Sequence, residues 1–394
     1  MDVVETTIIG AGVVGTAVAH ELSKNGREVF VIEKNPGVTR GENQSSRNPG
    51  VIHSGLYYDQ ATRPLKAELC VLGNQMLYAF CRAHEVPHLR CGKLMVATSE
   101  SDWPNIELYL ARARANGVEA RMLDREEVTD REPNVQILGA LYLPSTGVVD
   151  PTRLVYQLFI LASNHGAHFL TETDLVGIRP RVEGLELTVR NRDGSEETFL
   201  SKEMINSAGL YADEVARMLN PASQYQVDPM RCEFARFYRT KRPDLMCDMN
   251  VYPAPFKVDL PSGSYWTVGT HLTPTIEPAP NGGWTPGPIM TAGPISFPAR
   301  GKEDFGGEFR PISEYFDTVS SYFPGLRESD LEPYQVGVLA YLSGHLDWLI
   351  QRDEKHPSCI HLLGMGSPAL TSCLALADHV RRVIDGLSFP HTDS

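Results

Sequence analysis

The first part of the chain has the clearest pattern of hydrophobic and polar positions. Residues 6–9 and 29–32 are short β-branched and apolar runs, the composition of buried strands. Between them, Gly10-Ala-Gly-Val-Val-Gly15 leads into a helical pattern that continues to about Lys24 and closes at Asn25-Gly26. The pattern predicts a complete β–α–β unit within about thirty residues.

The rest of the pattern predicts helices towards both ends and strands in the middle. Helical stretches are expected over residues 62–84, 105–116, 125–130, 151–165 and 369–384. Strands are expected over residues 168–178, 184–190, 197–206, 265–270 and 359–363. Residues 253–311 are dense in Pro and Gly, which is typical of loops around a sheet. The predicted fold class is α/β with a mostly β middle, so one domain is expected to be assembled from distant segments.

Composition narrows the class of protein. Of the 394 residues, 42% are hydrophobic and 22% are charged, which is typical of a globular protein with a sizeable core. The 36 basic residues against 49 acidic ones give a net charge of −13, which argues against nucleic-acid binding and against a polybasic membrane anchor. The longest apolar stretch, residues 154–162, is too short to span a bilayer. We therefore expect an enzyme or a small-ligand-binding protein, with no nucleic-acid partner and no transmembrane segment.

Cysteine usage bears on the compartment. The seven cysteines are scattered and include no Cys-x-x-Cys pair, and no signal or Arg-rich transit peptide is recognisable before the first strand. These features disfavour a disulfide framework and a zinc knuckle, so a cytoplasmic protein is expected. His84-Glu-Val-Pro-His88 matches a zinc-protease pattern, but Pro87 should end the helix that this pattern needs. No metal site is expected.

The glycine turn predicts a dinucleotide site. Gly10 makes the tight turn, Gly12 lets backbone approach a pyrophosphate, and Gly15 allows close packing of helix and strand. Glu33 follows Gly15 by 18 residues, at the tip of the second strand, where a carboxylate can accept both hydroxyls of an adenosine ribose. This motif alone does not separate FAD from NAD.

The next segment separates the two cofactors. Asn43-Gln-Ser-Ser-Arg-Asn-Pro-Gly-Val-Ile-His-Ser-Gly-Leu-Tyr-Tyr58 resembles a block of FAD enzymes of the D-amino-acid-oxidase superfamily, and more closely of the L-2-hydroxyglutarate dehydrogenase/oxidase family. The resemblance continues, in family order over nearly the whole chain, in Leu65-Lys-Ala-Glu-Leu-Cys70, Cys91-Gly-Lys-Leu-Met-Val-Ala-Thr98, Pro144-Ser-Thr-Gly-Val-Val-Asp150, Ile205-Asn-Ser-Ala-Gly-Leu-Tyr-Ala-Asp213, Val268-Gly-Thr-His-Leu-Thr273 and Ser367-Pro-Ala-Leu-Thr-Ser372.

The resemblance implies a GR2-type fold with two domains. A Rossmann-like FAD-binding domain would comprise residues 1–85, 145–220 and 332–394, and a substrate domain with a large mixed β-sheet would comprise residues 86–144 and 221–331. The residues implied to bind FAD are Gly10, Gly12, Val14, Gly15, Glu33, Lys34, Ser45, Ser46, Arg47, Leu175, Ala208, Gly209, Gly364, Met365, Gly366, Pro368, Ala369, Leu370 and Thr371. Physical chemistry supports the last block, since helix-end N–H groups stabilise the negative charge of a reduced flavin.

The same resemblance suggests residues for chemistry. His53 is the candidate general base, because an imidazole that titrates near neutrality can take the hydroxyl proton while hydride goes to the flavin. His271, in the substrate sheet, is the second catalytic candidate. Tyr57, Arg231 and Leu339 are expected in the substrate pocket.

Three positions depart from the family. Asn43 stands where the family has His, Arg231-Cys-Glu233 replaces Arg-Gly-Glu, and Leu339 replaces an arginine suited to a substrate carboxylate. A preference for 2-hydroxyglutarate is therefore not expected. The candidate replacement cations are Arg63, Lys66, Lys93, Arg231 and Lys302, and each is expected as a solvated surface charge.

The function expected is FAD-dependent dehydrogenation of a CH–OH carbon in a small, 2-hydroxy-acid-like substrate. Two alternatives stay open: oxidation of a C–N bond in an amino acid or amine, and an FAD-binding protein without turnover. The expected partners are the substrate and an electron acceptor, which is oxygen, a quinone or an electron-transfer protein. The sequence leaves open which acceptor is used, the oligomeric state and whether FAD is covalently attached.

Overall fold

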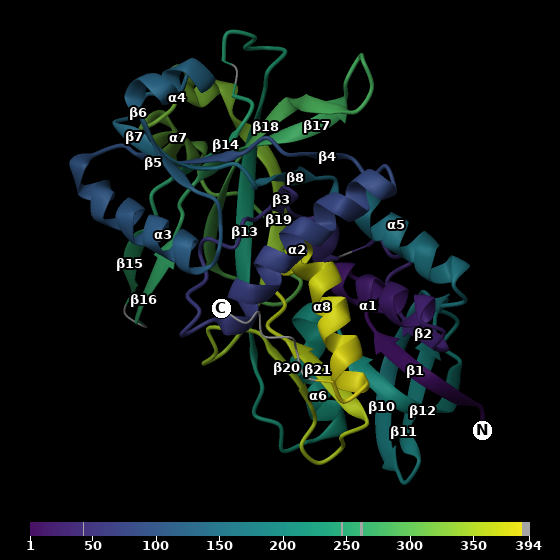
Figure 1. Ribbon diagram of the computed structural model, residues 1–394. Coiled ribbons are helices and arrows are strands. Elements are labelled where there is room, and N and C mark those ends of the chain that lie inside the picture. The colour runs from purple at the N-terminus through teal and green to yellow at the C-terminus, as the bar shows by residue number, and fades with distance from the viewer. Residues whose placement is uncertain (42, 246, 261–262, 388–394) are drawn as a thin grey trace.

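The computed structural model describes residues 1–41, 43–245, 247–260 and 263–387. Two sheets of eight strands each organise this part of the chain. The first sheet lies in the lower right of Figure 1, around β1 and β12, and the second lies in the upper part, around β14 and β18. Both sheets combine segments that are far apart in the sequence.

The first sheet has β1 (Val3–Ile9) near its centre. β1 pairs in parallel with β2 (Val29–Ile32) on one side and with β12 (Glu196–Asn206) on the other. Its remaining strands are β9 (His168–Leu170), β10 (Thr173–Arg181), β11 (Gly184–Asn191), β20 (Leu349–Arg352) and β21 (Cys359–Leu363). Because β12 and β21 are parallel neighbours, the last strand completes a sheet that the first strand begins.

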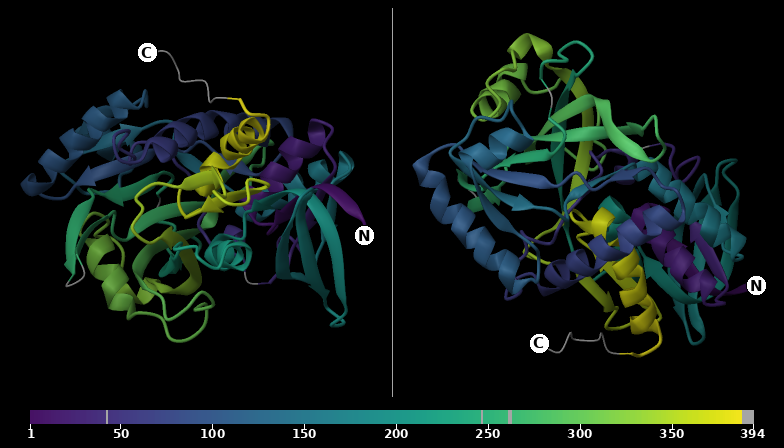
Figure 2. Two further views of the ribbon diagram at one scale, coloured as in Figure 1. Left: turned by 90° about the horizontal axis from the view of Figure 1, so that it is seen from below. Right: turned by 45° about the horizontal axis from the view of Figure 1, so that its top comes forward.

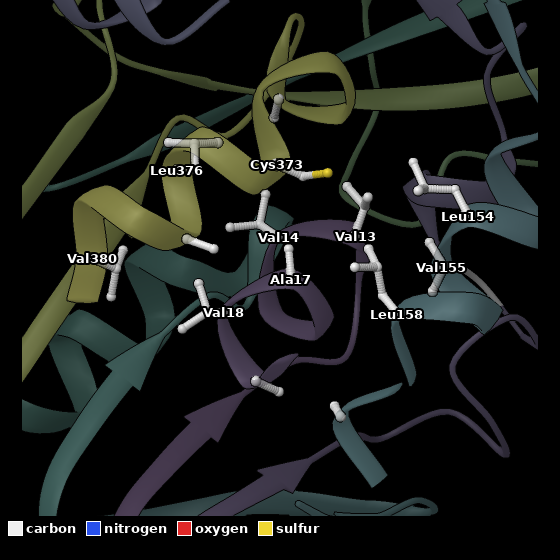
Figure 3. Packing of buried hydrophobic residues seen from close by; sticks show 14 of the residues in the cluster. Val13, Val14, Ala17, Val18, Leu154, Val155, Leu158, Cys373, Leu376 and Val380 are labelled. Carbon is white, nitrogen blue, oxygen red and sulfur yellow. The ribbon is translucent and has the colours of Figure 1, made fainter. Parts of the chain in front are cut away.

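Beside this sheet, α1 (Val13–Lys24) packs against α5 (Pro151–Asn164) and α8 (Ala369–Ile384), and α2 (Pro64–Ala83) packs against α8. The helix α6 (Ala212–Leu219) packs on strands β10, β12 and β21 of the same sheet. Figure 3 shows the apolar side chains of α1, including Val14 and Val18, between those of α5 and those of α8, such as Leu376 and Val380. In Figures 1 and 2, α8 in yellow lies beside α1 in purple. α2 crosses α8 closely, since a Cβ on Gly73 would lie 2.6 Å from the Cα of Ser372.

The second sheet has the strand order β19-β13-β18-β17-β14-β5-β7-β6. Its strands are β19 (Glu332–Leu342), β13 (Val227–Tyr238), β18 (Trp284–Pro298), β17 (His271–Pro278), β14 (Asn250–Pro253), β5 (Lys93–Ala97), β7 (Gly139–Leu143) and β6 (Arg121–Asp124). In sequence, α3 (Trp103–Ala115) and α4 (Arg125–Arg131) lie between strands β5 and β7 of this sheet, and α7 (Ile312–Ser320) lies between β18 and β19. The helix α6 follows β12.

Two small sheets complete the strands. β3 (Val51–Ile52), β8 (Gly147–Val149) and β4 (His88–Leu89) form a three-stranded sheet, and β15 (Phe256–Leu260) pairs with β16 (Gly263–Thr267). The single-turn helix η1 (Gln44–Ser46) precedes β3.

The structure confirms most predicted elements and corrects two. β21 and α8 have the predicted bounds. The strand predicted over 168–178 is two strands, because the backbone turns at Glu172, which has a positive φ of 55°. β19 pairs with β13 in the second sheet. The division into two domains, with residues 332–394 in the FAD-binding domain, stays a prediction.

Two further expectations concern the helix at residues 62–84 and the strand at residues 265–270. α2 ends at Ala83, and residues 88–89 form β4, so His84 and His88 do not share a helix. The strand predicted over 265–270 corresponds to β16, which ends at Thr267. Within the described ranges, none of the helices has the length and hydropathy needed to cross a membrane.

Candidate active site

The turn from β1 into α1 approaches other backbone so closely that side chains are excluded. Gly10 has a φ of +97°, and a Cβ there would lie 2.8 Å from the carbonyl oxygen of Ser207. A Cβ on Gly15 would lie 1.9 Å from the carbonyl oxygen of Gly10. At Gly12, a Cβ would meet only the hydroxyl of Ser45, at 3.2 Å. Gly10 and Gly15 are therefore required by the fold, whereas Gly12 leaves space in front of the helix.

Glu33 lies at the carboxyl end of β2 and is fixed by backbone donors. Its Oε2 accepts a hydrogen bond from the backbone N–H of Ala11 at 2.7 Å, and its Oε1 accepts one from that of Asn35 at 2.8 Å. Oε1 also accepts from Asn35 Nδ2 at 2.8 Å, so Oε2 is the oxygen that keeps a further lone pair. This arrangement fits the ribose-binding acid of a dinucleotide site.

The N-terminal end of α1 faces the segment of η1. The backbone N–H of Val13 donates to Ser45 Oγ at 2.8 Å, and the first turn of α1 carries no acidic residue. A pyrophosphate would therefore meet the positive end of the helix without an opposing carboxylate. Asn43, one of the departures from the family, accepts from the backbone N–H groups of Ser45 and Ser46 and so caps η1.

A cleft of about 430 Å³ opens at the carboxyl ends of β1 and β2. Of the residues expected at the cofactor or substrate, those that line it are Gly10, Gly12, Val14, Glu33, Lys34, Ser45, Leu175, Ala208, Gly209, Leu339, Met365 and Gly366. The expected residues outside its lining are Gly15, Ser46, Arg47, His53, Tyr57, Arg231, His271, Gly364, Pro368, Ala369, Leu370 and Thr371. The cleft's glycine floor, ribose-type acid and helix terminus fit the ADP part of FAD.

A loop of the second half of the chain, residues 299–307, lies beside this cleft, and we call it the strap. Tyr211, which lines the cleft, donates its hydroxyl to Glu303 Oε1 of the strap at 2.7 Å. The ammonium of Lys34 lies 3.7 Å from the centroid of the Tyr211 ring, and the guanidinium of Arg47 lies 4.7 Å from that of Phe305. The strap could not be predicted from the sequence, because no motif identifies Glu303 or Phe305 as site residues.

Arg231, expected in the substrate pocket, is buried and its guanidinium is engaged by groups of the chain itself. Its Nε donates to Glu233 Oε1 at 2.6 Å, and its Nη1 donates to the backbone carbonyl oxygens of Asp304 and Gly306, both at 2.7 Å. Side chains alternate along β13, so Arg231 and Glu233 share one face while Cys232 points to the other, where it contacts Ser296. Arg231 therefore anchors the strap.

His53 is fixed between α2 and α8. Its backbone N–H donates to Thr371 Oγ1 at 3.0 Å, and its carbonyl oxygen accepts from Asn74 Nδ2 at 2.9 Å. Its ring Nε2 lies 3.3 Å from the hydroxyl of Ser367, the residue that follows Gly366 of the cleft. The ring Nδ1 is buried and has no hydrogen-bond partner among the described residues. The imidazole thus has one nitrogen available beside the cleft.

The structure brings the two candidate histidines together in a buried polar cluster. The ring of His271 stacks on that of Tyr252, with centroids 3.7 Å apart, and Lys93 Nζ donates to the Tyr57 hydroxyl at 3.0 Å. Burial, and next the charge of Lys93, lowers the pKa of His53 to about 3. The pKa of His271 is lowered by burial, then by Lys93 and His53. Both imidazoles are therefore neutral at physiological pH.

Three of the five candidate cations are buried, which contradicts the expectation of surface charges. Lys93 is 0% exposed, Arg231 2% and Lys66 6%. Lys66 Nζ donates to the carbonyl oxygen of Leu346, and Lys302 Nζ lies 2.6 Å from both Asp213 and Glu214. Arg63 is half-buried and lies over the ring of Tyr58, 5.7 Å from its centroid. The burial of these cations could not be predicted from the sequence, because a lysine in an apolar run can also lie at a strand end with its charged group in solvent.

Leu339 lies on β19, half-buried, at the edge of the cleft. The backbone N–H of its neighbour Val338 donates to Gln44 Oε1, so β19 is joined to η1 at this point. A Cβ on Gly337 would lie 2.5 Å from the carbonyl oxygen of Arg47. Leu339 therefore places an apolar side chain on a rigid strand where the family's arginine is replaced.

Comparison with known proteins agrees with this site. The model of the FAD dependent oxidoreductase family matches residues 5–382. The mitochondrial L-2-hydroxyglutarate dehydrogenase of Arabidopsis thaliana is 31% identical over 417 residues, which cover 96% of this chain and 82% of that protein. The L-2-hydroxyglutarate dehydrogenase of Escherichia coli K12 is 28% identical over 410 residues, with 95% and 91% covered.

Solved structures share the fold. An L-alpha-glycerophosphate oxidase from Mycoplasma pneumoniae, solved with FAD bound, matches with a TM-score of 0.83 at 23% identity and covers 99% of this chain and 97% of that one. A glycine oxidase from Geobacillus kaustophilus matches with a TM-score of 0.78 at 17% identity, with 99% and 96% covered. The fold expected from the sequence is confirmed.

Proposed function

The chain belongs to the FAD dependent oxidoreductase family, and we propose that it dehydrogenates a CH–OH carbon of a small, 2-hydroxy-acid-like substrate. It is an FAD-dependent oxidoreductase, and FAD held in the cleft would supply the hydride acceptor. The observation that carries the proposal is His53: a neutral imidazole with a free nitrogen, fixed beside the cleft. The relatives named as L-2-hydroxyglutarate dehydrogenases support an alcohol rather than an amine as substrate.

In this proposal different residues of the cleft bind different parts of FAD. Glu33 accepts from the adenosine ribose, the Gly12 turn and the end of α1 hold the pyrophosphate, and Leu175 lies at the adenine. The segment from Met365 to Thr371 brings the start of α8 towards the isoalloxazine. These roles follow from the lining of the cleft and from the resemblance to the family.

His53 acts as the general base. Thr371 and Asn74 fix its backbone from two helices, so the ring is held without relying on its own nitrogens. A free, neutral nitrogen then accepts the hydroxyl proton as the hydride leaves the same carbon. His271 lies in the same cluster and is the second candidate for this role.

The test is anaerobic reduction of the flavin in wild type and in His53→Gln. Losing a positioned base costs ~10²–10⁴ in rate, so His53→Gln should keep FAD bound while reduction slows by about that factor. The control is His165→Gln, since His165 is exposed at the end of α5 and should leave the rate unchanged. Reduction at the wild-type rate in His53→Gln would transfer the role to His271 or to water.

The same assay separates the alternatives. Ammonia release with an amino acid or amine would show oxidation of a C–N bond, which the fold also supports in a glycine oxidase. Absence of bleaching with every hydroxy acid, amino acid and neutral alcohol would indicate an FAD-binding protein without turnover. The electron acceptor is identified separately, by reoxidation with oxygen, a quinone or an electron-transfer protein. A cytoplasmic location is also proposed, supported by seven free cysteines.

The substrate proposal includes a departure from the relatives: 2-hydroxyglutarate is not the preferred substrate. A charge-assisted bond to arginine is worth roughly 1.5–3 kcal/mol, and Leu339 supplies none. Leu339→Arg should therefore raise kcat/KM for L-2-hydroxyglutarate at least about tenfold. Efficient turnover of L-2-hydroxyglutarate by wild type would contradict this expectation.

A further inference from the structure

We infer that Lys93 and Tyr57 together bind the one anionic group of the substrate, and that this substrate is a 2-hydroxy monocarboxylate with an apolar tail. The inference rests on the proposed function and deepens it by naming the substrate class. Tyr57 is the contact residue, and Lys93 is the positioning residue behind it.

Lys93 is a buried lysine without a counter-ion among the described residues. Its side chain is fully buried on β5, and its Nζ lies 4.2 Å from the centroid of the Tyr57 ring and 4.6 Å from that of Tyr252. Its single hydrogen bond goes to the Tyr57 hydroxyl, and no carboxylate within the described ranges pairs with it. Burial lowers the pKa of Lys93 to about 7, because an unpaired charge is unfavourable in a dry site. An anion from outside the chain would stabilise the ammonium form.

The position of Lys93 suits the carboxylate of a 2-hydroxy acid. That carboxylate is attached to the carbon that is oxidised, so the group that binds it must lie beside the base. Lys93 Nζ lies 4.2 Å from the ring centroid of Tyr57, and that ring lies edge-on to the ring of His53 with centroids 6.5 Å apart. Lys93 Nζ also lies 4.6 Å from the ring centroid of Tyr252, on which His271 stacks. Lys93 therefore contacts the aromatic neighbours of both histidines.

Tyr57 transmits this charge to the pocket. Its hydroxyl oxygen accepts the hydrogen bond from Lys93, which leaves the O–H of Tyr57 free to donate to an anion. Tyr57 is half-buried, so it is the more accessible of the two residues, and burial raises its pKa, which keeps the proton on the hydroxyl. Contacts with Tyr109 and Arg112 hold the residue from α3.

The charge count indicates one anion rather than two. Arg231 and Lys302 are occupied by carboxylates, and Lys66 is bonded to a backbone carbonyl. Leu339 offers an apolar surface where a second cation would be needed for a dicarboxylate. Arg63 forms no ion pair in the part of the chain that the structure describes, but it lies over the ring of Tyr58 rather than beside the histidine cluster. A second carboxylate would therefore lack a partner.

The experiment uses the FAD-loaded protein and three small hydroxylated probes that differ in the number of carboxylate groups. L-2-hydroxyisocaproate is a monocarboxylate, L-2-hydroxyglutarate is a dicarboxylate, and 4-methylpentane-1,2-diol is neutral. Anaerobic flavin reduction gives kcat and KM for each probe, and titration with isocaproate, which carries no oxidisable hydroxyl, gives a Kd from the flavin spectrum. The variants are Lys93→Met, Lys93→Arg and Tyr57→Phe, with Lys66→Met as the matched control for loss of a buried lysine.

Wild type should prefer the monocarboxylate. Lys93→Met and Tyr57→Phe should raise the Kd for isocaproate and the KM for L-2-hydroxyisocaproate about 10- to 100-fold, the loss of one charge-assisted bond. Lys93→Arg should restore part of the affinity, Lys66→Met should change neither constant, and the diol should respond to none of the variants. Lys93→Met should also keep or raise the melting temperature, because it removes an unpaired buried charge.

Two outcomes overturn the inference: an unchanged Kd for isocaproate in both Lys93→Met and Tyr57→Phe, or a wild-type preference for the dicarboxylate that Arg63→Met abolishes. A lower melting temperature with unchanged Kd would mean that Lys93 is structural. Failure of the proposed function looks different. In that case isocaproate binds and depends on Lys93, while none of the hydroxylated probes reduces the flavin.

Discussion

Gly12 and Gly15 belong to one motif but are needed for different reasons. A Cβ on Gly15 would overlap the Gly10 carbonyl oxygen, whereas a Cβ on Gly12 would meet only the flexible Ser45 hydroxyl. Gly15 is therefore required by the packing of α1 on β1, and Gly12 by what enters the cleft. The motif in the sequence does not separate these two requirements.

Substitutions at the two glycines should separate folding from cofactor binding. Gly12→Val should fold but lose FAD, because the side chain enters the space in front of α1. Gly15→Ala should lower the stability of the apoprotein by about 1–3 kcal/mol through overpacking. Thermal unfolding of apoprotein and the flavin absorbance of purified protein measure the two effects. Equal stability loss in both variants would contradict the distinction.

The pH dependence of the reductive step should reflect the buried state of His53. Burial, and next Lys93, lowers its pKa to about 3, so the imidazole stays unprotonated as the pH falls from 8 to 5. The rate constant for flavin reduction at saturating substrate should therefore lack an acid limb from His53 in this range. A limb with an apparent pKa near 6.5 would show that His53 is solvated in the working enzyme.

The candidate site was partly predictable from single residues. His53, Tyr57 and the glycine turn were found because they lie in contiguous blocks that resemble one family. Lys93 was found as a candidate cation but given the wrong environment, since burial depends on neighbouring strands that the sequence does not place. The ion pairs of Arg231 were missed for a related reason. The alternation of side chains along β13 assigns Arg231 and Cys232 to opposite faces of the strand, but it does not show which face lies towards the substrate.

Among the elements, the strap joins the two halves of the molecule. Arg231 and Arg300 both pair with Asp304, while Glu303 and Phe305 contact Tyr211 and Arg47 of the cofactor half. The strap has no regular secondary structure between residues 299 and 310, and one backbone hydrogen bond, from Ala299 N–H to the Pro229 carbonyl oxygen, ties its start to β13. Side-chain contacts fix the rest of it. We expect it to limit the release of FAD.

Removing the anchor should release the strap. Arg231→Met leaves Glu233 and Asp304 without their buried cation, and breaking such a pair costs about 3–5 kcal/mol. The variant should unfold at lower denaturant and release FAD faster, as fluorescence of free flavin would show. Glu303→Gln weakens a surface contact and should speed release only. Unchanged release in both variants would exclude the strap from cofactor retention.

Secondary structure was predicted best where the local hydrophobic pattern alone decides the element and its ends. The amphipathic α8 and the buried β21 were found with their observed bounds because flanking turns mark both ends. The pairing of β19 with β13 in the second sheet was not predicted, since it is a long-range choice between two apolar edges. Such a choice is set by packing across the whole chain and leaves no local signal.

Considered as a whole, the molecule depends on α8 in two ways. Cys373, Leu376 and Val380 of α8 fill the core against α1, and Thr371 bonds the backbone of His53. The last helix therefore supports both the first sheet and the candidate base. Neither role follows from the sequence of α8, which predicts only an amphipathic helix.

Deleting α8 should therefore abolish folding rather than impair catalysis alone. A chain that stops at Gly366 exposes the apolar face of α1 and loses several buried side chains, each worth about 1.5–3 kcal/mol. It should be insoluble or lack cooperative unfolding in circular dichroism. Thr371→Val is the matched control, which keeps the core, keeps the fold and perturbs only His53. A folded, FAD-binding truncated chain would contradict this role.

The strand order of the first sheet has a consequence for synthesis on the ribosome. β1 and β2 emerge first, but β12, the other neighbour of β1, follows only after residues 33–195. At ~5–20 residues per second, that segment takes roughly 8–30 s to make. During this interval the Val- and Ile-rich edge of β1 has no partner strand, and an open apolar edge is a template for aggregation. The nascent chain should accordingly need a holding chaperone until β12 leaves the exit tunnel.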